Sequence, residues 1–187
     1  LIEGPRGSRL LVDGGPDPTR LITALDGRLA PRDRRVDILL LTHPHEDHVA
    51  GLPLLLERYR IGRALDVGMR GRGPGFAAWE IALAVRNVAR GRLATGDTLA
   101  LDGVRFTVLW PDPATVPAES PDQGTAVNNV SVVLLGEYGR QRVLLMGDVE
   151  EAIDPILVGR GLPRADVLKV AHHGSRTSST EEFLEAV

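Results

Sequence analysis

The stretch LLLTHPHEDH, residues 39–48, joins an apolar run to three histidines and two acidic residues. The chain has only five histidines, and the other two, His172 and His173, are adjacent and follow a second apolar run. Imidazole and carboxylate groups are the usual nitrogen and oxygen ligands of divalent metals. Two such clusters, each after a predicted strand, indicate a metal site assembled from distant parts of the chain.

The spacing within the first cluster indicates two neighbouring ions. His43 and His45 are two residues apart, so both rings leave the same face of an extended chain. Asp47 and His48 lie beyond the strand end, where the chain turns into a helix, and they reach a neighbouring point. This spacing suits two ions about 3.5–4 Å apart.

Two later segments are candidates for the remaining ligands. Asp148 follows a strand and a glycine, where it could bridge both ions, and His172 or His173 ends the next strand. Taken alone, an aspartate after glycine is more often a turn or cap residue, and a histidine at a strand end is more often structural. The dense polar cluster at residues 43–48 must be satisfied, and this favours the metal interpretation.

Composition places the chain among ordinary globular proteins, and we expect a single domain over residues 1–187. The net charge of -3 gives no global basic field that would draw the protein to nucleic acid. Cysteine is absent, so disulfides and thiolate ligands are excluded. Any metal must therefore be held by histidines and carboxylates.

No apolar run approaches the roughly 20 residues of a membrane span, and no signal peptide is visible. The chain starts at Leu1, without methionine, in a predicted sheet, and stops at Val187 in a helical pattern. These features lead us to expect an excised domain of a longer protein.

Hydrophobic periodicity predicts strands and helices in two β-rich regions, each followed by helices, which suggests a pseudo-duplicated sandwich. A long loop with four prolines, residues 111–126, is typical of a binding loop or lid. The predicted strands are residues 9–15, 36–42 and 63–67, two hairpins at 97–110 and 130–146, and residues 166–171. The predicted helices are residues 19–29, 48–59, 76–89, 150–158 and 180–187.

The motif THPHEDH, residues 42–48, resembles the His-x-His-x-Asp-His signature of the metallo-β-lactamase fold superfamily. Asp-Gly-Gly at 13–15, Gly-Asp at 147–148 and the late histidine pair follow the family's order, so the resemblance covers residues 9–175. The segments NNVS at 128–131, LLMGD at 144–148 and DVLKVAHHGS at 166–175 are similar to the soluble hydrolase domain of ComEC-type competence proteins, membrane proteins that take up DNA.

The resemblance implies an α+β fold, a four-layer αββα sandwich with two divalent ions, Zn²⁺ or Mn²⁺, at the sheet edges. It also implies phosphodiester hydrolysis by a water whose pKa the two ions lower. The implied ligands are His43 and His45 for the first ion, Asp47 and His48 for the second, and Asp148 between them. One of His172 and His173 would bind the second ion, and the other would contact the phosphate or protonate the leaving oxygen. The implied catalytic residues are Asp47, Asp148, His172 and His173.

Two features near these ligands qualify the resemblance. Many members have a further histidine ligand where this chain has Asn128 and Asn129, and an amide oxygen is a weak zinc ligand that suits a hard ion such as Mn²⁺. Asp13 matches the family's buried acid, which would orient the metal-binding loop without binding metal. A turn-capping aspartate before Gly-Gly is the alternative.

Arg70, Arg72, Arg176 and Ser175 are candidates for contacts with a phosphate backbone. Since 21 of the 22 basic residues are arginine, a given arginine carries little information, and a serine such as Ser175 is more often simply part of a turn. The seven aromatic residues offer no obvious platform for single-stranded bases.

The leading hypothesis is a phosphodiesterase or nuclease domain that acts on DNA during uptake, tethered to a membrane channel domain on the extracytoplasmic side of a bacterial membrane. A stand-alone hydrolase is the alternative location, and the oligomeric state is not indicated. A second hypothesis keeps the fold but changes the bond to a lactone, a lactam or another ester. A third is a degenerate domain that binds metal or DNA without turnover.

Overall fold

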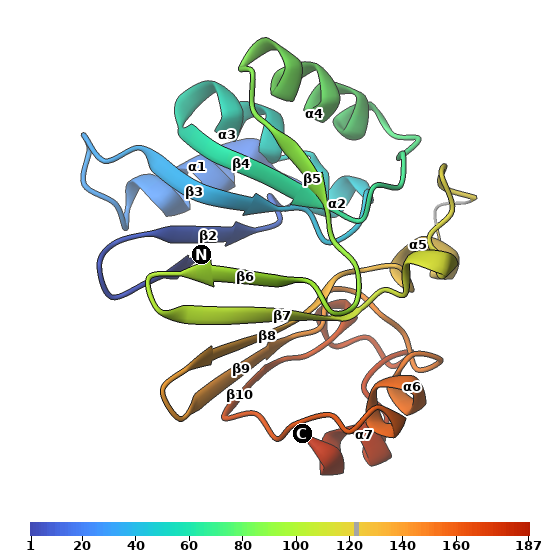
Figure 1. Cartoon of the computed structure of the whole chain (residues 1–187). Helices are drawn as coiled ribbons and strands as arrows, with labels where there is room; N and C mark the ends of the chain where they lie inside the picture. Colours follow the sequence, from blue (N-terminus) through green and yellow to red (C-terminus); the bar gives the residue numbers. More distant parts are fainter. Residues whose placement is uncertain (122–123) are drawn as a thin grey trace.

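The computed structural model describes residues 1–121 and 124–187 of the chain. Two five-stranded sheets pack face to face, and helices cover both outer faces (Figure 1). The predicted four-layer αββα sandwich is therefore confirmed. Within the described residues, no helix is long and apolar enough to cross a membrane.

The first sheet has the strand order β1-β2-β3-β4-β5, and its β2 to β5 run parallel while β1 pairs antiparallel with β2. Helices α1 to α4 lie on its outer face (Figure 1). The strands are β1 Ile2–Glu3, β2 Arg9–Val12, β3 Arg35–Leu40, β4 Arg60–Asp66 and β5 Arg90–Arg92. The helices are α1 Pro18–Asp26, α2 Glu46–Val49, α3 Leu52–Arg58 and α4 Pro74–Val85.

The second sheet has the order β10-β9-β8-β7-β6, antiparallel except for the parallel pair of β9 and β10. Helices α6 and α7 lie on its outer face (Figure 1). The strands are β6 Thr98–Leu101, β7 Val104–Trp110, β8 Val133–Tyr138, β9 Gln141–Leu145 and β10 Val167–Lys169. The remaining elements are η1 Pro113–Thr115, α5 Thr125–Asn128, α6 Asp154–Gly159, η2 His172–Gly174 and α7 Glu181–Ala186.

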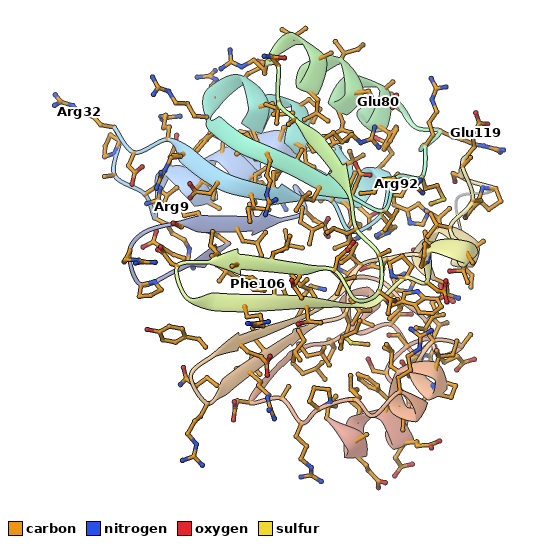
Figure 2. The ribbon with its side chains drawn as sticks, viewed as in Figure 1. Arg9, Arg32, Glu80, Arg92, Phe106 and Glu119 are labelled. Atoms are coloured by element: carbon orange, nitrogen blue, oxygen red, sulfur yellow. The ribbon has the colours of Figure 1, made fainter. Side chains whose placement is uncertain are left out.

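The apolar run of β3 is buried on both faces, as its continuous hydrophobicity predicts. Leu40 belongs to the core between the two sheets, whereas Leu39 and Leu41 pack under the helices of the first sheet. Phe106 of β7 enters the same inter-sheet core from the other sheet and is fully buried (Figure 2). Alternate side chains of the central strand thus pack into the core between the sheets and into the core under the helices, and this holds the layers together.

Several predicted elements differ from the structure, among them the helix predicted at residues 150–158, which begins at Asp154 as α6. The helix predicted at residues 48–59 is divided into α2 and α3 at Gly51, whose Cβ would lie 2.2 Å from the backbone oxygen of Gly14. The Asp-Gly-Gly turn therefore packs directly on the chain here, and only glycine fits. The predicted loop at residues 111–126 contains η1 and the start of α5, and its residues 122–123 lie outside the described residues.

Candidate metal centre

The segments after β2, β3, β9 and β10 meet at one edge of the sandwich. Asp13 follows β2 with a left-handed φ of 58°, a conformation that aspartate tolerates better than most residues. Its carboxylate accepts hydrogen bonds from the Thr42 amide at 2.7 Å and from the Thr42 hydroxyl at 2.8 Å. The same carboxylate lies 2.8 Å from Nδ1 of His48. Asp13 thus holds both ends of the histidine-rich loop.

Asp148 enters the site from the second sheet. The preceding Gly147 is left-handed, with a φ of 55°, and a Cβ there would lie 2.7 Å from the Ser131 side chain. The amide of Asp148 donates to Oγ of the buried Ser131 at 3.1 Å. This tight turn directs the carboxylate of Asp148 at the loop that follows β3.

Three side chains converge around Oδ2 of Asp148. Nε2 of His48 lies 3.1 Å from this oxygen and Nε2 of His173 lies 3.2 Å from it. Oδ2 of Asp47 lies 3.5 Å from Nε2 of His173 and 3.8 Å from Nε2 of His48. All four ligand atoms lie within 4.8 Å of one another, so they form a candidate metal-binding group of two imidazoles and two carboxylates.

Two carboxylates lie close together in this group, and a positive charge between them would offset their repulsion. Burial lowers the pKa of His48, but hydrogen bonds to Asp13 and Asp148 outweigh it and raise the pKa to about 10. Burial raises the pKa of Asp148, and its contacts with His48 and the other histidines bring it down to about 2. In the metal-free chain a proton on His48 therefore supplies the positive charge that a divalent ion would supply.

A second group of ligand atoms lies beside the first. Nε2 of His43 and Nδ1 of His45 are 3.0 Å apart. Burial, with the neighbouring His48 and His45, lowers the pKa of His43 well below its ordinary value, and a neutral imidazole is the form that binds metal. Among the described residues, Oδ1 of Asp148 is buried without a hydrogen-bond partner. This unpaired acceptor belongs to a residue that lines the same cleft as His45, and it fits a second ion with Asp148 between the two groups.

The two asparagines differ in their surroundings. Nδ2 of the buried Asn128 donates to Glu150 at 2.8 Å, and its Oδ1 has no hydrogen-bond partner among the described residues. Asn129 instead supports the fold, since its Oδ1 accepts from the Glu150 amide at 2.7 Å and its backbone oxygen accepts from the Trp110 indole at 2.6 Å. Only Asn128 therefore faces the site.

The histidine pair lies on a left-handed turn. His172, His173 and Gly174 have φ values of 47°, 53° and 80°, and each non-glycine residue in this region costs of the order of 1–3 kcal/mol. The turn directs His173 at Asp148. His172 instead lies 3.4 Å from the Thr177 hydroxyl and 3.7 Å from Glu150, where it lines a cleft of about 470 Å³.

The cleft has a polar lining and includes residues that the sequence did not single out. Glu46 accepts a hydrogen bond from the Gly75 amide at 2.9 Å, and Glu150 accepts from the Thr125 hydroxyl at 3.0 Å. The sequence did contain a signal for both residues. Glu46 lies inside the histidine motif, and Glu150 follows Asp148 by two residues. The lining residues are His45, Glu46, Asp47, Gly124, Thr125, Asn128, Asp148, Glu150 and His172.

The candidate phosphate-contacting residues are outside this lining. Arg70 is exposed, and its guanidinium lies 3.8 Å from the carboxylate of Glu80 in α4. Arg72 and Arg176 are exposed, and the Ser175 hydroxyl lies 3.0 Å from the Thr177 hydroxyl. The structure therefore brings the metal-ligand candidates together and leaves the arginines on the surrounding surface.

Comparison of the sequence with known proteins finds relatives among competence proteins. The chain is 34% identical to ComE operon protein 3 of Bacillus subtilis over 158 residues, which cover 81% of this chain and 19% of that protein. It is 31% identical to competence protein ComA of Neisseria gonorrhoeae over 156 residues, 82% of this chain and 19% of that protein. The chain thus spans about a fifth of the length of these curated relatives, and the predicted resemblance to competence proteins is confirmed.

The comparison with solved structures supports the fold described above. MEM-A1, a subclass B3 metallo-beta-lactamase isolated from a soil metagenome library, superposes with a TM-score of 0.58 at 16% identity, covering 92% of this chain and 72% of that one. The family model described as the metallo-beta-lactamase superfamily matches residues 1–187. The chain therefore belongs to the metallo-beta-lactamase superfamily.

Proposed function

We propose that this chain is a metal-dependent phosphodiesterase that acts on DNA during its uptake. The observation that supports this most directly is the pair of ligand groups that meet at Asp148. Oδ2 of Asp148 lies within 3.2 Å of Nε2 of His48 and of His173, and its Oδ1 is buried without a hydrogen-bond partner among the described residues. Two adjacent divalent ions are suited to in-line displacement at phosphorus, because one stabilises the attacking oxygen and one the leaving oxygen.

The residues divide between the two proposed ions as follows. Asp47, His48 and His173 would hold one ion with Oδ2 of Asp148, and His43 and His45 would hold the other with Oδ1 of Asp148. Ions of Zn²⁺ or Mn²⁺ would supply a nucleophile from water near neutral pH and would polarise the phosphoryl oxygen. The protein contributes two neutral imidazoles at one position and a balanced set of two carboxylates and two imidazoles at the other.

His173 and His172 take different roles in this proposal. His173 approaches the Asp148 carboxylate and is the proposed ligand. His172 lines the cleft beside Glu150 and Thr177, where its ring could hold a proton for the leaving oxygen. General acid catalysis of this kind typically contributes about 10²–10⁴-fold in rate.

The substrate and setting are drawn from the relatives. Similarity to ComE operon protein 3 and to competence protein ComA supports DNA as the phosphodiester and DNA uptake as the process. We propose that the chain is a domain tethered to a membrane channel and placed on the extracytoplasmic side. Arg70, Arg72, Arg176 and Ser175 remain the proposed contacts for a phosphate backbone outside the cleft.

A hydrolysis assay tests this function. The metal-stripped chain is incubated with single-stranded DNA, with bis-p-nitrophenyl phosphate and with a lactone, each with Mn²⁺ or Zn²⁺ restored. We expect diester cleavage that is lost in Asp47→Ala and Asp148→Ala. The exposed Glu185 provides a matched control, Glu185→Ala, which removes a carboxylate remote from the site and should leave cleavage unchanged.

The alternatives give distinct results in the same assay. Lactone turnover without diester cleavage would contradict the proposal and identify a hydrolase of another bond. Metal binding without turnover of any of the three substrates would identify a domain that binds without catalysis.

A further inference from the structure

The Asn128 amide has a fixed orientation, because a carboxylate accepts hydrogen bonds and cannot donate them. Nδ2 of Asn128 must therefore face Oε1 of Glu150, at 2.8 Å, and Oδ1 must face the opposite way. Glu150 is itself held by the Thr125 hydroxyl at 3.0 Å and by its own amide, which donates to Asn129 at 2.7 Å. The acceptor oxygen of Asn128 is thus directed into the site by a rigid neighbour.

The direction in which the Thr42 hydroxyl donates its proton determines the tautomer of His43. The Thr42 hydroxyl donates to Asp13 at 2.8 Å, so Oγ1 of Thr42 accepts from Nδ1 of His43 at 3.0 Å. Nε2 of His43 then carries a lone pair, as a metal ligand requires. Nδ1 of His45 lies 3.0 Å from this nitrogen, so a shared ion would bind His45 through Nδ1.

Binding through Nδ1 requires the proton of His45 to be on Nε2. This nitrogen is buried and has no hydrogen-bond partner among the described residues, and the same holds for Oδ1 of Asn128. His45 and Asn128 line the same cleft, and burial lowers the pKa of His45 while Asn128 acts in the opposite direction. In the metal-free chain, His45 is paired through Nδ1 with Nε2 of His43. Nε2 of His45 and Oδ1 of Asn128 are then left without hydrogen-bond partners among the described residues.

We propose that Asn128, held by Glu150, accepts the Nε2 hydrogen of His45 and so presents Nδ1 of His45 to the first ion. This inference rests on the proposed metal-dependent function. It assigns Asn128 and Glu150 as positioning residues that do for His45 what Asp13 does for His48. Partners of this kind fix the tautomer and the orientation of a ligating imidazole.

Histidine NMR tests the assignment directly. The whole chain, labelled with ¹⁵N-histidine and loaded with Zn²⁺, contains five imidazoles that single His→Gln variants assign. We expect long-range ¹H–¹⁵N correlations to show His45 protonated at Nε2 and bound through Nδ1. Binding of His45 through Nε2 would overturn the proposal.

Substitutions test the role of each partner by metal titration and by the His45 tautomer. Asn128→Leu should weaken binding of one ion about 10–100-fold and leave His45 in mixed tautomers, while the second ion is retained. Loss of one ion with an unchanged tautomer would mean that Asn128 is a direct ligand, and it would overturn the proposal, as would an unchanged affinity. The exposed Asn87 offers the control Asn87→Asp, for which no change is expected.

Glu150 provides a second pair of variants in case Asn128→Leu does not fold. Glu150→Gln keeps an oxygen that can accept from Asn128 and should retain the wild-type tautomer, whereas Glu150→Leu should lose it. Equal spectra for these two variants would contradict the role of Glu150. Diester cleavage is measured separately, so a chain that shows the expected tautomer without cleavage contradicts the proposed function and leaves this inference standing.

Discussion

Replacing Asp13 by asparagine is the most informative perturbation of the site. Asparagine tolerates the left-handed backbone that residue 13 adopts, so the change isolates the carboxylate. The amide oxygen can still accept from the Thr42 amide, as the carboxylate does at 2.7 Å. The amide NH₂ group would face the Thr42 hydroxyl, which can turn to accept, and Nδ1 of His48, which in the wild type lies 2.8 Å from a carboxylate oxygen.

In this variant the amide NH₂ group and the Nδ1 hydrogen of His48 would face each other as two donors. A neutral His48 avoids this in the tautomer that has no hydrogen on Nδ1. Its proton must leave Nδ1, and the neutral ring then carries hydrogen on Nε2, the nitrogen that faces Asp148 at 3.1 Å. That tautomer cannot bind a metal through Nε2. Removing such a supporting hydrogen bond typically lowers metal affinity about 10–100-fold, and each tenfold is about 1.4 kcal/mol. Loss of a charge-assisted hydrogen bond should also destabilise the metal-free chain by about 1.5–3 kcal/mol.

Titration of the metal-stripped chain against a chromophoric chelator measures this effect. We expect Asp13→Asn to weaken one of the two binding events by 10–100-fold, an order of magnitude taken from other metal sites. Asp97→Asn serves as the matched control, because Asp97 accepts a backbone hydrogen bond from Ala94 outside the site. An Asp13→Asn chain that is folded and binds both ions within twofold of the wild type would refute the tautomer argument.

Three further predictions follow from the same structure. Without metal, the free energy of unfolding should fall as the pH rises from about 6.5 towards 10. In this range the unfolded chain releases the His48 proton, while the folded chain, in which the pKa of His48 is raised to about 10, keeps it. Urea denaturation across this range tests this, and an unchanged midpoint would contradict it. Gly51→Ala should destabilise by about 1–3 kcal/mol, since its Cβ would lie 2.2 Å from a backbone oxygen, whereas Gly159→Ala has open space and should be neutral in the same measurement. Removing metal with a chelator should lower the melting temperature, because ions present at 100 times Kd stabilise the folded state by about 2.7 kcal/mol; equal melting curves would rule out this linkage.

The sequence contained most of the information on the layers and the first half of the site. The apolar run before His43 predicted a strand buried on both faces, and β3 is such a strand. The spacing of histidines and acids predicted two neighbouring ligand groups, because alternation along an extended chain is a local property. The hairpin predicted at residues 97–110 turns at Asp102 and Gly103, and Asp-Gly is a pair that favours the positive φ values that both residues adopt.

Features that depend on contacts between distant segments were not predictable. The division between α2 and α3 results from the approach of Gly51 to the backbone of Gly14, which no local pattern encodes. The left-handed turn at His172 and His173 runs against residue preferences, and the His172 amide donates to the Gly147 oxygen of a distant segment at 3.1 Å. The orientation of Asn128 required the position of Glu150, 22 residues later in the chain.

Counting the ions bound per chain tests the central claim, that two metal positions meet at Asp148. Native mass spectrometry of the chain loaded with Zn²⁺ or Mn²⁺ should show two ions in the wild type. His43→Ala and His173→Ala should each retain one ion, and Asp148→Ala should weaken both. A single ion in the wild type, or two ions retained at full affinity in Asp148→Ala, would contradict the account.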